Sequence, residues 1–304
     1  MSGRPEIKWL RAGAIDQTRW DHCIDNADNG LIYAYSWYLD AMAEKWDALV
    51  YGDYEMVMPL PWRSKFGIAY IYQPFLCAQL GIFGNNISTE ITRQFIEAIP
   101  SRFRLVEFSL NPGNPQPPHC LNRVNYLLDL NPTYEQIFHG YRENIQRNIR
   151  KAFQLGCSVS MEINPEQVIE LALAQMHVRN EKINANIQSF KKLYALLKIK
   201  NEAKIYGILA PDGKLIASAV FFFSRRRAYY ILVGNHPNGR TLGASHALID
   251  AFIKDHAGTD LILDFEGSDV RNLAFFYGSF GAKPEQYPFL KWNRLPLWLK
   301  WLKN

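Results

Sequence analysis

Residues 125–292 switch between two hydrophobic periods, and the order of these switches limits the folds open to the chain. Apolar residues three or four apart predict helices, whereas short apolar runs between turn residues predict strands. In chain order the patterns predict a strand at 125–130, a helix at 131–156, a strand at 157–163, helices starting at 164 and at 189, strands at 204–210, 214–223 and 228–234, a helix at 243–256, a strand at 261–265, a helix at 269–280 and a strand at 285–292. This order predicts an α/β protein with an α+β mixed sheet, in which an antiparallel meander precedes a late crossover helix.

A proline-rich segment marks the predicted domain boundary. Four prolines and a glycine lie within Asn111–Pro118, a composition that cannot continue a helix or a central strand. Before this segment the patterns predict a helix from Ser36 through Trp46, strands at 48–51, 54–60 and 68–72, a helix at 88–99 and a strand at 105–110. Because domains span about 100–200 residues, the 304 residues predict two domains, placed at 1–124 and 125–304.

The composition is that of a globular protein. Hydrophobic residues make up 48% of the chain and charged residues 21%, which excludes disordered and collagen-like chains. No run of about 18 uncharged apolar residues is present, and the first residues lack the apolar stretch of a secretory signal. The four cysteines are scattered, and the seven histidines show no metal-ligand spacing. We therefore expect a cytoplasmic protein without a metal site.

The net charge of +5 is unevenly distributed along the chain. Residues 1–124 hold 11 basic and 13 acidic residues, a net charge of −2, whereas the remainder holds 23 and 16, a net charge of +7. An anionic ligand is therefore expected mainly in the C-terminal half. Solvated lysines are the alternative explanation, and an excess this small does not predict DNA binding.

Asn238–Ser245 lies between a predicted strand and a predicted helix and contains two glycines. Free backbone amides at a helix start form an anion site, and Arg240 adds a charge-assisted contact. The alternative is an ordinary turn in which Gly243 serves only packing. The segment resembles the coenzyme A pyrophosphate loop of the GNAT acyltransferase superfamily, which runs Arg/Gln-x-x-Gly-x-Gly/Ala. Arg240 and Gly243 match its first and fourth positions, and Ser245 stands where Gly or Ala is usual.

The predicted order of strands and helices also resembles a GNAT domain. This resemblance implies that the donor pyrophosphate of coenzyme A is held by Arg240, Gly243, Ala244 and Ser245. It also implies two tandem GNAT-like domains, the first of them degenerate.

A second constellation follows the strand predicted at 261–265. Asp264 and Glu266 stand at its end beside Gly267, where a carboxylate can accept a proton from an amine. Local helix capping is the alternative role for these carboxylates. The segment from Phe276 to Gly281 resembles the Leu-Tyr-x-x-x-Gly-Phe ending of many GNAT domains. The resemblance implies that Tyr277 protonates the departing thiolate, and core packing is the alternative for this residue.

A third feature is a basic helical face. Arg147, Arg150 and Lys151 are three and four residues apart and therefore share one side of the predicted helix. Such a face can bind the phosphates of RNA or of a nucleotide-linked substrate, and a solvated surface is the alternative.

Residues 144–152 resemble a stretch of Fem-type proteins, tandem-GNAT enzymes that transfer amino acids from aminoacyl-tRNA to peptidoglycan precursors. The resemblance extends to the Asp-Phe-Glu-Gly segment and to the Phe-Gly ending, and it implies tRNA contacts by the basic face. The chain departs from these proteins in two respects. Phe276-Tyr277 replaces their Phe-Lys pair, and the pyrophosphate loop is largely kept, so both differences favour an acyl-CoA donor.

The C-terminal tail, residues 291–304, interleaves Trp, Leu and Lys. This pattern suits peripheral contact with a membrane interface, which would place the protein at the inner face of the membrane. Packing of the tail on its own domain is the alternative.

These features together predict an N-acyltransferase that moves an acyl group from acyl-CoA to an amine acceptor, a small molecule or a cell-wall precursor, bound between the domains. Glu266 or Asp264 would remove the ammonium proton, backbone amides near Val233 and Gly234 would hold the oxyanion, and Tyr277 would protonate the leaving group. Two alternatives stay open: Fem-like transfer from aminoacyl-tRNA, and a non-catalytic binding protein with the same fold.

Overall fold

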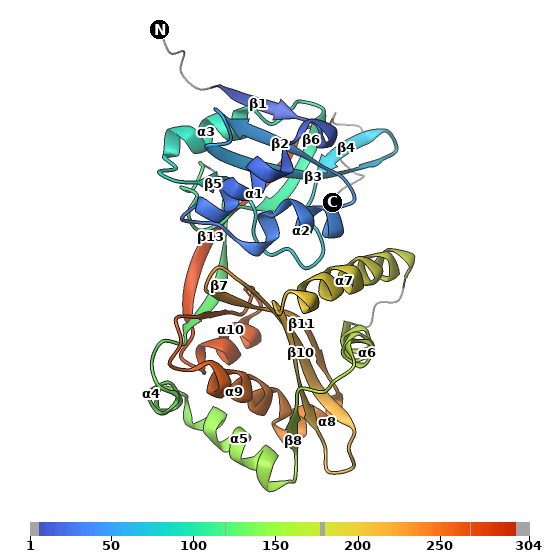
Figure 1. The fold of residues 1–304 in the computed structure, drawn as a ribbon, viewed down its shortest axis with the longest axis vertical. Coiled ribbons are helices and arrows are strands. Elements are labelled where there is room, and N and C mark those ends of the chain that lie inside the picture. The colour runs from blue at the N-terminus through green and yellow to red at the C-terminus, as the bar shows by residue number, and fades with distance from the viewer. Residues whose placement is uncertain (1–5, 119, 177–179, 268, 296–304) are drawn as a thin grey trace. The chain divides into compact units, whose positions relative to one another are not determined.

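The computed structural model describes residues 6–118, 120–176, 180–267 and 269–295, and the chain divides into two units (Figure 1). Unit 1 comprises Met1–Arg123 and Gln286–Asn304, and unit 2 comprises Val124–Glu285. The division after Arg123 lies one residue before the boundary that the sequence predicts. Residues from Gln286 onward, placed by the sequence in the second domain, group with unit 1 because strand β13 pairs there with strand β6.

Unit 1 is built on one mixed sheet. Its strands follow the order β1-β2-β3-β4-β6-β13, and neighbouring strands are antiparallel except for the parallel pair β4 and β6. Side-chain caps begin two of its helices: Asp16 accepts from the Arg19 amide, and Ser88 accepts from the Ile91 amide. The elements are β1 (Ile7–Leu10), 3-10 helix η1 (Ala12–Ala14), α1 (Gln17–Asn26), 3-10 helix η2 (Ile32–Ala34), α2 (Ser36–Met42), β2 (Trp46–Tyr51), β3 (Met56–Lys65), β4 (Ile68–Ile71), β5 (Phe83–Gly84), α3 (Thr89–Glu97), β6 (Phe103–Ser109) and β13 (Lys283–Asn293), whose first three residues belong to unit 2.

The helix predicted from Ser36 through Trp46 is shorter than expected. It ends at Met42, and Trp46 begins strand β2, where its ring packs 5.0 Å from that of Trp20. The apolar spacing extended past the true end because strand residues that face the same core continue the pattern by chance.

Unit 2 contains the predicted meander and crossover. Its strands follow the order β7-β12-β11-β10-β9-β8, and β11 and β12 are the parallel pair that helix α9 connects. The mixed α/β class that the sequence predicts is confirmed. The elements are β7 (Leu121–Asp129), α4 (Tyr134–His139), α5 (Glu143–Gln154), β8 (Ser158–Ser160), α6 (Pro165–Met176), α7 (Glu181–Ile199), β9 (Ala203–Leu209), β10 (Leu215–Ser224), β11 (Arg227–Asn235), α8 (Pro237–Leu242), α9 (Ala244–His256), β12 (Ile262–Asp264) and α10 (Arg271–Gly278).

Two predicted helix boundaries in unit 2 are wrong. The helix expected over 131–156 is two helices, α4 and α5, because Gly140 ends the first and the Arg142 amide then donates to the carbonyl of Ser279. Helix α7 starts after Asn180, whose side chain caps the Ile183 amide, so Ser189 lies inside the helix.

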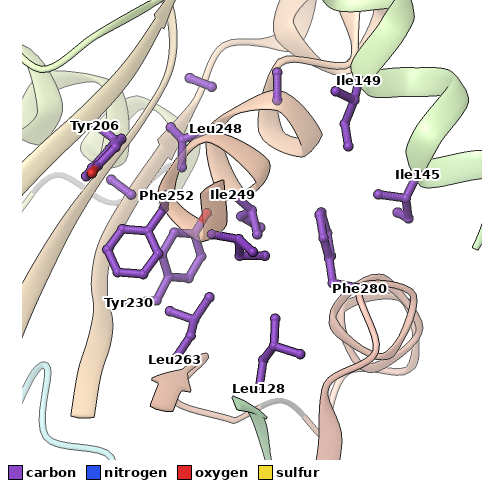
Figure 2. Packing of buried hydrophobic residues seen from close by; sticks show 14 of the residues in the cluster. Leu128, Ile145, Ile149, Tyr206, Tyr230, Leu248, Ile249, Phe252, Leu263 and Phe280 are labelled. Carbon is purple, nitrogen blue, oxygen red and sulfur yellow. The ribbon is translucent and has the colours of Figure 1, made fainter. Parts of the chain in front are cut away.

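Helices cover both faces of the unit 2 sheet. Helices α5 and α9 pack on one face and α6 and α7 on the other (Figure 1). Figure 2 shows Ile145 and Ile149 of α5 and Phe280 pointing into the same apolar interior as the α9 side chains. In that interior the rings of Phe221 and Phe252 stack with centroids 3.8 Å apart. This core fixes α9 against the strands that carry the candidate site.

Within the described ranges, we find no helix with the length and apolar character needed to cross a bilayer.

Candidate active site

The two parallel strands of unit 2 differ in length at the predicted reacting centre. Strands β11 and β12 are in register from Arg227 opposite Ile262 to Tyr229 opposite Asp264. Strand β12 ends there, whereas β11 continues to Asn235. Ligands of sheets with parallel strands commonly bind beyond the carboxyl ends of the strands. The residues that follow Asp264 therefore occupy a position suited to a ligand site.

Asp264 is buried and fully engaged with protein donors. Its carboxylate accepts from Arg227 Nη1 at 2.8 Å, from Asn125 Nδ2 at 2.9 Å and from the Glu266 amide at 2.7 Å. A carboxylate held by three donors has little capacity to take a proton from a substrate amine. The geometry therefore gives Asp264 a structural role and leaves Glu266 as the candidate base.

Glu266 lies in an unusual backbone conformation. Its φ is +61°, and Gly267 follows with φ +89°, so two successive residues are left-handed. A non-glycine residue in this region is strained, and such strain concentrates at functional sites. Glu266 is partly exposed, and its charge acts on the nearby Tyr277 hydroxyl. The turn thus places a partly exposed carboxylate where its charge reaches the candidate acid.

Tyr277 lies on α10 and is buried among aromatic rings. Its ring stacks on Phe265 with centroids 4.4 Å apart and meets the edge of Tyr230 at 6.5 Å. Burial, with a further contribution from Glu266, raises the pKa of Tyr277 to about 12. The hydroxyl therefore stays protonated at neutral pH and is available as a hydrogen-bond donor. Tyr277 can therefore serve both core packing and catalysis. Its ring packs in the core, while the pKa of its hydroxyl responds to the charge of Glu266.

The predicted pyrophosphate segment is helical rather than a loop. Residues 237–242 form the short helix α8, in which the Gly239 amide donates to the carbonyl of His236. A Cβ on Gly239 would lie 2.4 Å from the carbonyl oxygen of Ile216, so this glycine permits close packing on β10. The backbone of Arg240 belongs to α8, and its side chain lies outside the described part of the structure.

Gly243 separates α8 from α9 and has two structural functions. Its φ of +77° is left-handed, and it is the N-cap of α9, which begins at Ala244. A Cβ at this position would lie 2.5 Å from the carbonyl oxygen of Asn148 in α5. The packing role that the sequence left open for Gly243 is therefore present in the structure. The start of the 13-residue α9 also carries the positive end of the helix dipole, which favours an anion there.

The Ser245 hydroxyl is used within the protein. It donates to Asn235 Oδ1 at 2.6 Å, and Asn235 donates its amide and side chain to Gln175 Oε1 on α6. This chain of hydrogen bonds joins the end of β11 to the start of α9 and to α6. Ser245 thus helps to place the candidate anion site.

The residues predicted to form the oxyanion site lie on β11. Val233 is half-buried, and a Cβ on Gly234 would lie 2.7 Å from the Ala172 amide nitrogen of α6. Gly234 therefore permits a helix to approach the strand closely, a packing role that the sequence did not indicate.

The predicted basic face is on α5. Arg147, Arg150 and Lys151 are all exposed, and the Arg150 guanidinium donates to Gln146 at 3.3 Å. Among the described residues, no ion pair joins Glu143 to Arg147. The face is therefore open to an anionic partner.

The tail predicted to contact a membrane lies largely outside the described residues. Lys291 and Trp292 belong to β13, and Lys291 Nζ lies 3.4 Å from a carboxylate oxygen of Glu107. Residues 296–304 lie outside the described ranges.

Sequence reasoning missed the polar partners of Asp264. Arg227 and Asn125 come from two other strands, and they approach Asp264 only once the sheet is assembled. The parallel register of β11 with β12 depends on a crossover of more than 25 residues, which no local pattern specifies. In the sequence, Arg225-Arg226-Arg227 indicates a tight turn between two strands, and nothing in it indicates that Arg227 pairs with Asp264.

An open cavity of about 760 Å³ lies elsewhere in unit 2. The predicted site residues are not among those that line it, which are Leu127, Leu128, Asp129, Pro132, Gln136, Ile137, Gly140, Ile262, Phe280, Gly281, Lys283, Pro284 and Glu285. Ile262 is the first residue of β12, so this cavity adjoins the end of the strand opposite Glu266. In the part of the chain that the structure describes, no group of three or more His, Cys, Asp or Glu side chains is arranged to hold a metal ion.

Comparisons with known proteins agree with this architecture. Residues 139–269 match the family described as "Acetyltransferase (GNAT) domain". The structure of FemX is similar with a TM-score of 0.62 and 10% identity, over 92% of this chain and 96% of that one. A conserved protein of unknown function from Bacteroides thetaiotaomicron is similar with a TM-score of 0.56 and 10% identity, over 94% of this chain and all of that one.

The C-terminal domain of a protein assigned as a lysylphosphatidylglycerol synthetase in Agrobacterium fabrum is similar to the same degree. Its TM-score is 0.56 with 10% identity, over 92% of each chain. No curated protein sequence matches the chain. Identities this low show a shared fold.

The fold and the family match define the class of protein. Residues 139–269 match a GNAT acetyltransferase domain, and the chain shares its fold with FemX and with the lysylphosphatidylglycerol synthetase domain over 92% of its length. The protein is an acyltransferase.

Proposed function

We propose that this acyltransferase moves an acyl group from a coenzyme A thioester to the nitrogen of an amine acceptor, a small molecule or a cell-wall precursor. The observation that carries the proposal is the pair formed by Glu266 and Tyr277 beyond the end of β12. There the partly exposed carboxylate of Glu266, which lies within the residues that match the GNAT domain, raises the pKa of the buried Tyr277 phenol on the following helix.

Each residue of the proposed centre has one task. The Glu266 carboxylate takes a proton from the acceptor ammonium, directly or through water, and the freed amine attacks the thioester carbonyl carbon. A C–N bond forms and the C–S bond breaks, while backbone amides near Val233 and Gly234 stabilise the oxygen that carries negative charge. Tyr277 donates a hydrogen bond to the departing sulfur, which takes up the second proton that the nitrogen loses as the amide forms, and the proton taken by Glu266 is released to water.

The start of α9 is the proposed anchor for the donor pyrophosphate. Gly243, Ala244 and Ser245 form the first residues at the positive end of this helix, and Arg240 precedes them in α8. The hydrogen bond from Ser245 to Asn235 ties this anchor to β11, along which the acyl end of the donor would lie.

Three observations favour aminoacyl-tRNA as a second candidate donor. The basic face of α5 is exposed, as contact with an RNA backbone requires. A tyrosine with a pKa of about 12 is also better matched to a ribose oxygen, a strongly basic leaving group, than to a thiolate. The helical conformation of α8 in place of an open loop fits this candidate as well.

Calorimetric titration with coenzyme A and acetyl-CoA tests the donor. We expect micromolar binding that weakens about tenfold in Arg240→Ala, since a charge-assisted phosphate contact contributes about 1.5–3 kcal/mol. Arg226→Ala is the matched control, because Arg226 is exposed, pairs with Asp260 at the β10–β11 hairpin and should leave the affinity unchanged.

The absence of binding by folded protein would contradict the acyl-CoA proposal. Titration with aminoacyl-tRNA would then decide the second candidate, which predicts an affinity that falls steeply with salt and is lost on ribonuclease treatment. A non-catalytic binding protein would bind a donor but transfer no acyl group. The Glu266→Gln and Tyr277→Phe variants would then cause no loss of activity.

A further inference from the structure

A polar cluster lies on one face of the unit 2 sheet, beneath the Glu266 turn. Asp264 is 2% exposed, and the side chain of Arg227 is 18% exposed. Asn125 is also buried, and the half-buried Glu285 has a raised pKa because of burial and of the neighbouring Asp264 charge. Buried charges are retained only where they are paired, so this arrangement requires an explanation.

Strand register brings Arg227 to Asp264. Tyr229 is opposite Asp264, and Arg227 is two residues before Tyr229, so both side chains of the ion pair point to the same face. Burial would lower the pKa of Arg227, but Asp264 and Glu285 raise it above its ordinary value. Arg227 is therefore a permanent cation that holds one oxygen of Asp264.

Asp264 in turn holds the backbone of the turn. Its other oxygen accepts from the Glu266 amide at 2.7 Å and from Asn125 Nδ2 at 2.9 Å, while Asn125 Oδ1 accepts from the Tyr126 amide at 2.7 Å. The left-handed conformation of Glu266 is one that a side-chain-bearing residue rarely adopts unless its surroundings hold it. The Asp264 carboxylate supplies such a hold.

We propose that Arg227 is a positioning residue for acyl transfer: it orients Asp264, which fixes the Glu266 amide and thereby the turn that presents the Glu266 carboxylate next to Tyr277. This inference rests on the proposed function and adds to it a residue that no sequence motif contains. Arg227 touches neither the donor nor the acceptor in this account.

Amide hydrogen exchange at Glu266, followed by NMR, tests the connection without any activity. In Arg227→Met we expect exchange at Glu266 to accelerate at least tenfold, while buried α9 amides such as that of Leu248 keep their protection and report an intact fold. Arg227→Lys should retain part of the protection. Arg226→Met is the matched control, since Arg226 is the preceding residue and pairs with Asp260 at the surface. Unchanged exchange at Glu266 in folded Arg227→Met would overturn the proposal.

Arg227→Met leaves the buried Asp264 charge unpaired, which could prevent folding. A second variant provides a test in that case. The double variant Arg227→Met, Asp264→Asn contains neither charge, so it should fold and still lose protection at Glu266. Normal protection at Glu266 in this double variant would also overturn the proposal.

Kinetics separate this inference from the proposed function. In Arg227→Met we expect kcat to fall about tenfold or more with the KM of both substrates unchanged, and Arg227→Lys to recover part of the loss. A loss of kcat without any change in Glu266 exchange would contradict positioning through the turn. If the wild-type protein transfers no acyl group, the proposed function fails, whereas the exchange result still decides whether Arg227 holds the turn.

Discussion

At the scale of single residues, the environment of Tyr277 decides how it can act. Its pKa of about 12 lies some 3 to 4 units above that of an ordinary thiol, so complete proton transfer to a free thiolate would be uphill by about 5 kcal/mol. The physical consequence is that Tyr277 stabilises the departing sulfur mainly as a hydrogen-bond donor while the C–S bond is breaking.

The Tyr277→Phe variant measures this contribution. We expect kcat to fall about 10–100-fold with little change in KM, because one donor to a developing negative charge is lost while the stacking on Phe265 is kept. Steady-state kinetics with a saturating acceptor provide the measurement. An unchanged kcat would mean that Tyr277 is only a core residue.

The buried carboxyl of Asp250 on α9 is expected to make the stability of the protein depend on pH. Burial raises the pKa of its carboxyl, although the hydrogen bonds from the Tyr134 hydroxyl and the charge of Lys254 oppose the shift. Because the pKa is higher in the folded than in the unfolded protein, the folded state favours protonated Asp250. The contribution of this group to stability is therefore fully present at low pH and declines as pH rises through the folded pKa.

The Asp250→Asn variant removes this titration. We expect the free energy of unfolding of the wild type, relative to Asp250→Asn, to decrease between about pH 4 and pH 7. Urea denaturation at these two pH values tests the sign. A difference that increased with pH would show that the hydrogen bonds to the ionised carboxylate outweigh its burial.

At the scale of elements, the junction of α8 and α9 depends on Gly243. Replacing it with alanine introduces a Cβ 2.5 Å from the Asn148 carbonyl and places a side chain at φ +77°. We expect Gly243→Ala to lower the free energy of unfolding by about 2–4 kcal/mol, because overpacking adds to the conformational strain.

Gly213→Ala is the matched control for this prediction. Gly213 has nearly the same φ, +79°, but no atom lies within 4 Å of its would-be Cβ. We expect only the conformational part of the loss there, about 1 kcal/mol. Equal losses in the two variants, measured by urea denaturation, would show that contact with α5 contributes nothing.

Elements that are determined by local sequence were predictable. Elements that depend on contacts between distant residues were not. The β9–β10 hairpin follows from Pro211-Asp212-Gly213, a turn sequence that acts locally. The break at Gly140 was missed because the apolar period continues across it and the Ser279 carbonyl that engages Arg142 is distant in sequence. Helix α8 was missed because Asn238-Gly239 is typical of a turn, while its packing on Ile216 is tertiary.

The same distinction between local sequence and distant contacts applies to the residues of the candidate site. Glu266 and Tyr277 were found because they stand in recognisable segments next to glycines and a strand end. The engagement of Asp264 by Arg227 and Asn125 follows from the pairing of three strands, so only the assembled sheet distinguishes the structural carboxylate from the candidate base.

At the scale of the whole molecule, the charge distribution distinguishes the two candidate donors. Replacement of Arg147, Arg150 and Lys151 by glutamate reverses the basic face of α5 without touching buried residues. With an acyl-CoA donor we expect kcat/KM to change less than about threefold. With an aminoacyl-tRNA donor, loss of several phosphate contacts should lower kcat/KM by at least two orders of magnitude, which the same assay would show.

We propose that unit 2 catalyses acyl transfer to an amine at Glu266 and Tyr277. Mass spectrometry of an amine panel incubated with acetyl-CoA tests it most directly, with the wild-type protein and Glu266→Gln compared side by side. We expect an N-acetylated product that the wild type forms with turnover and that Glu266→Gln forms at least 100-fold more slowly. Equal product formation by both proteins would contradict the assignment of Glu266, and the absence of product from the wild type with every amine would contradict the proposed acetyl-CoA-dependent reaction.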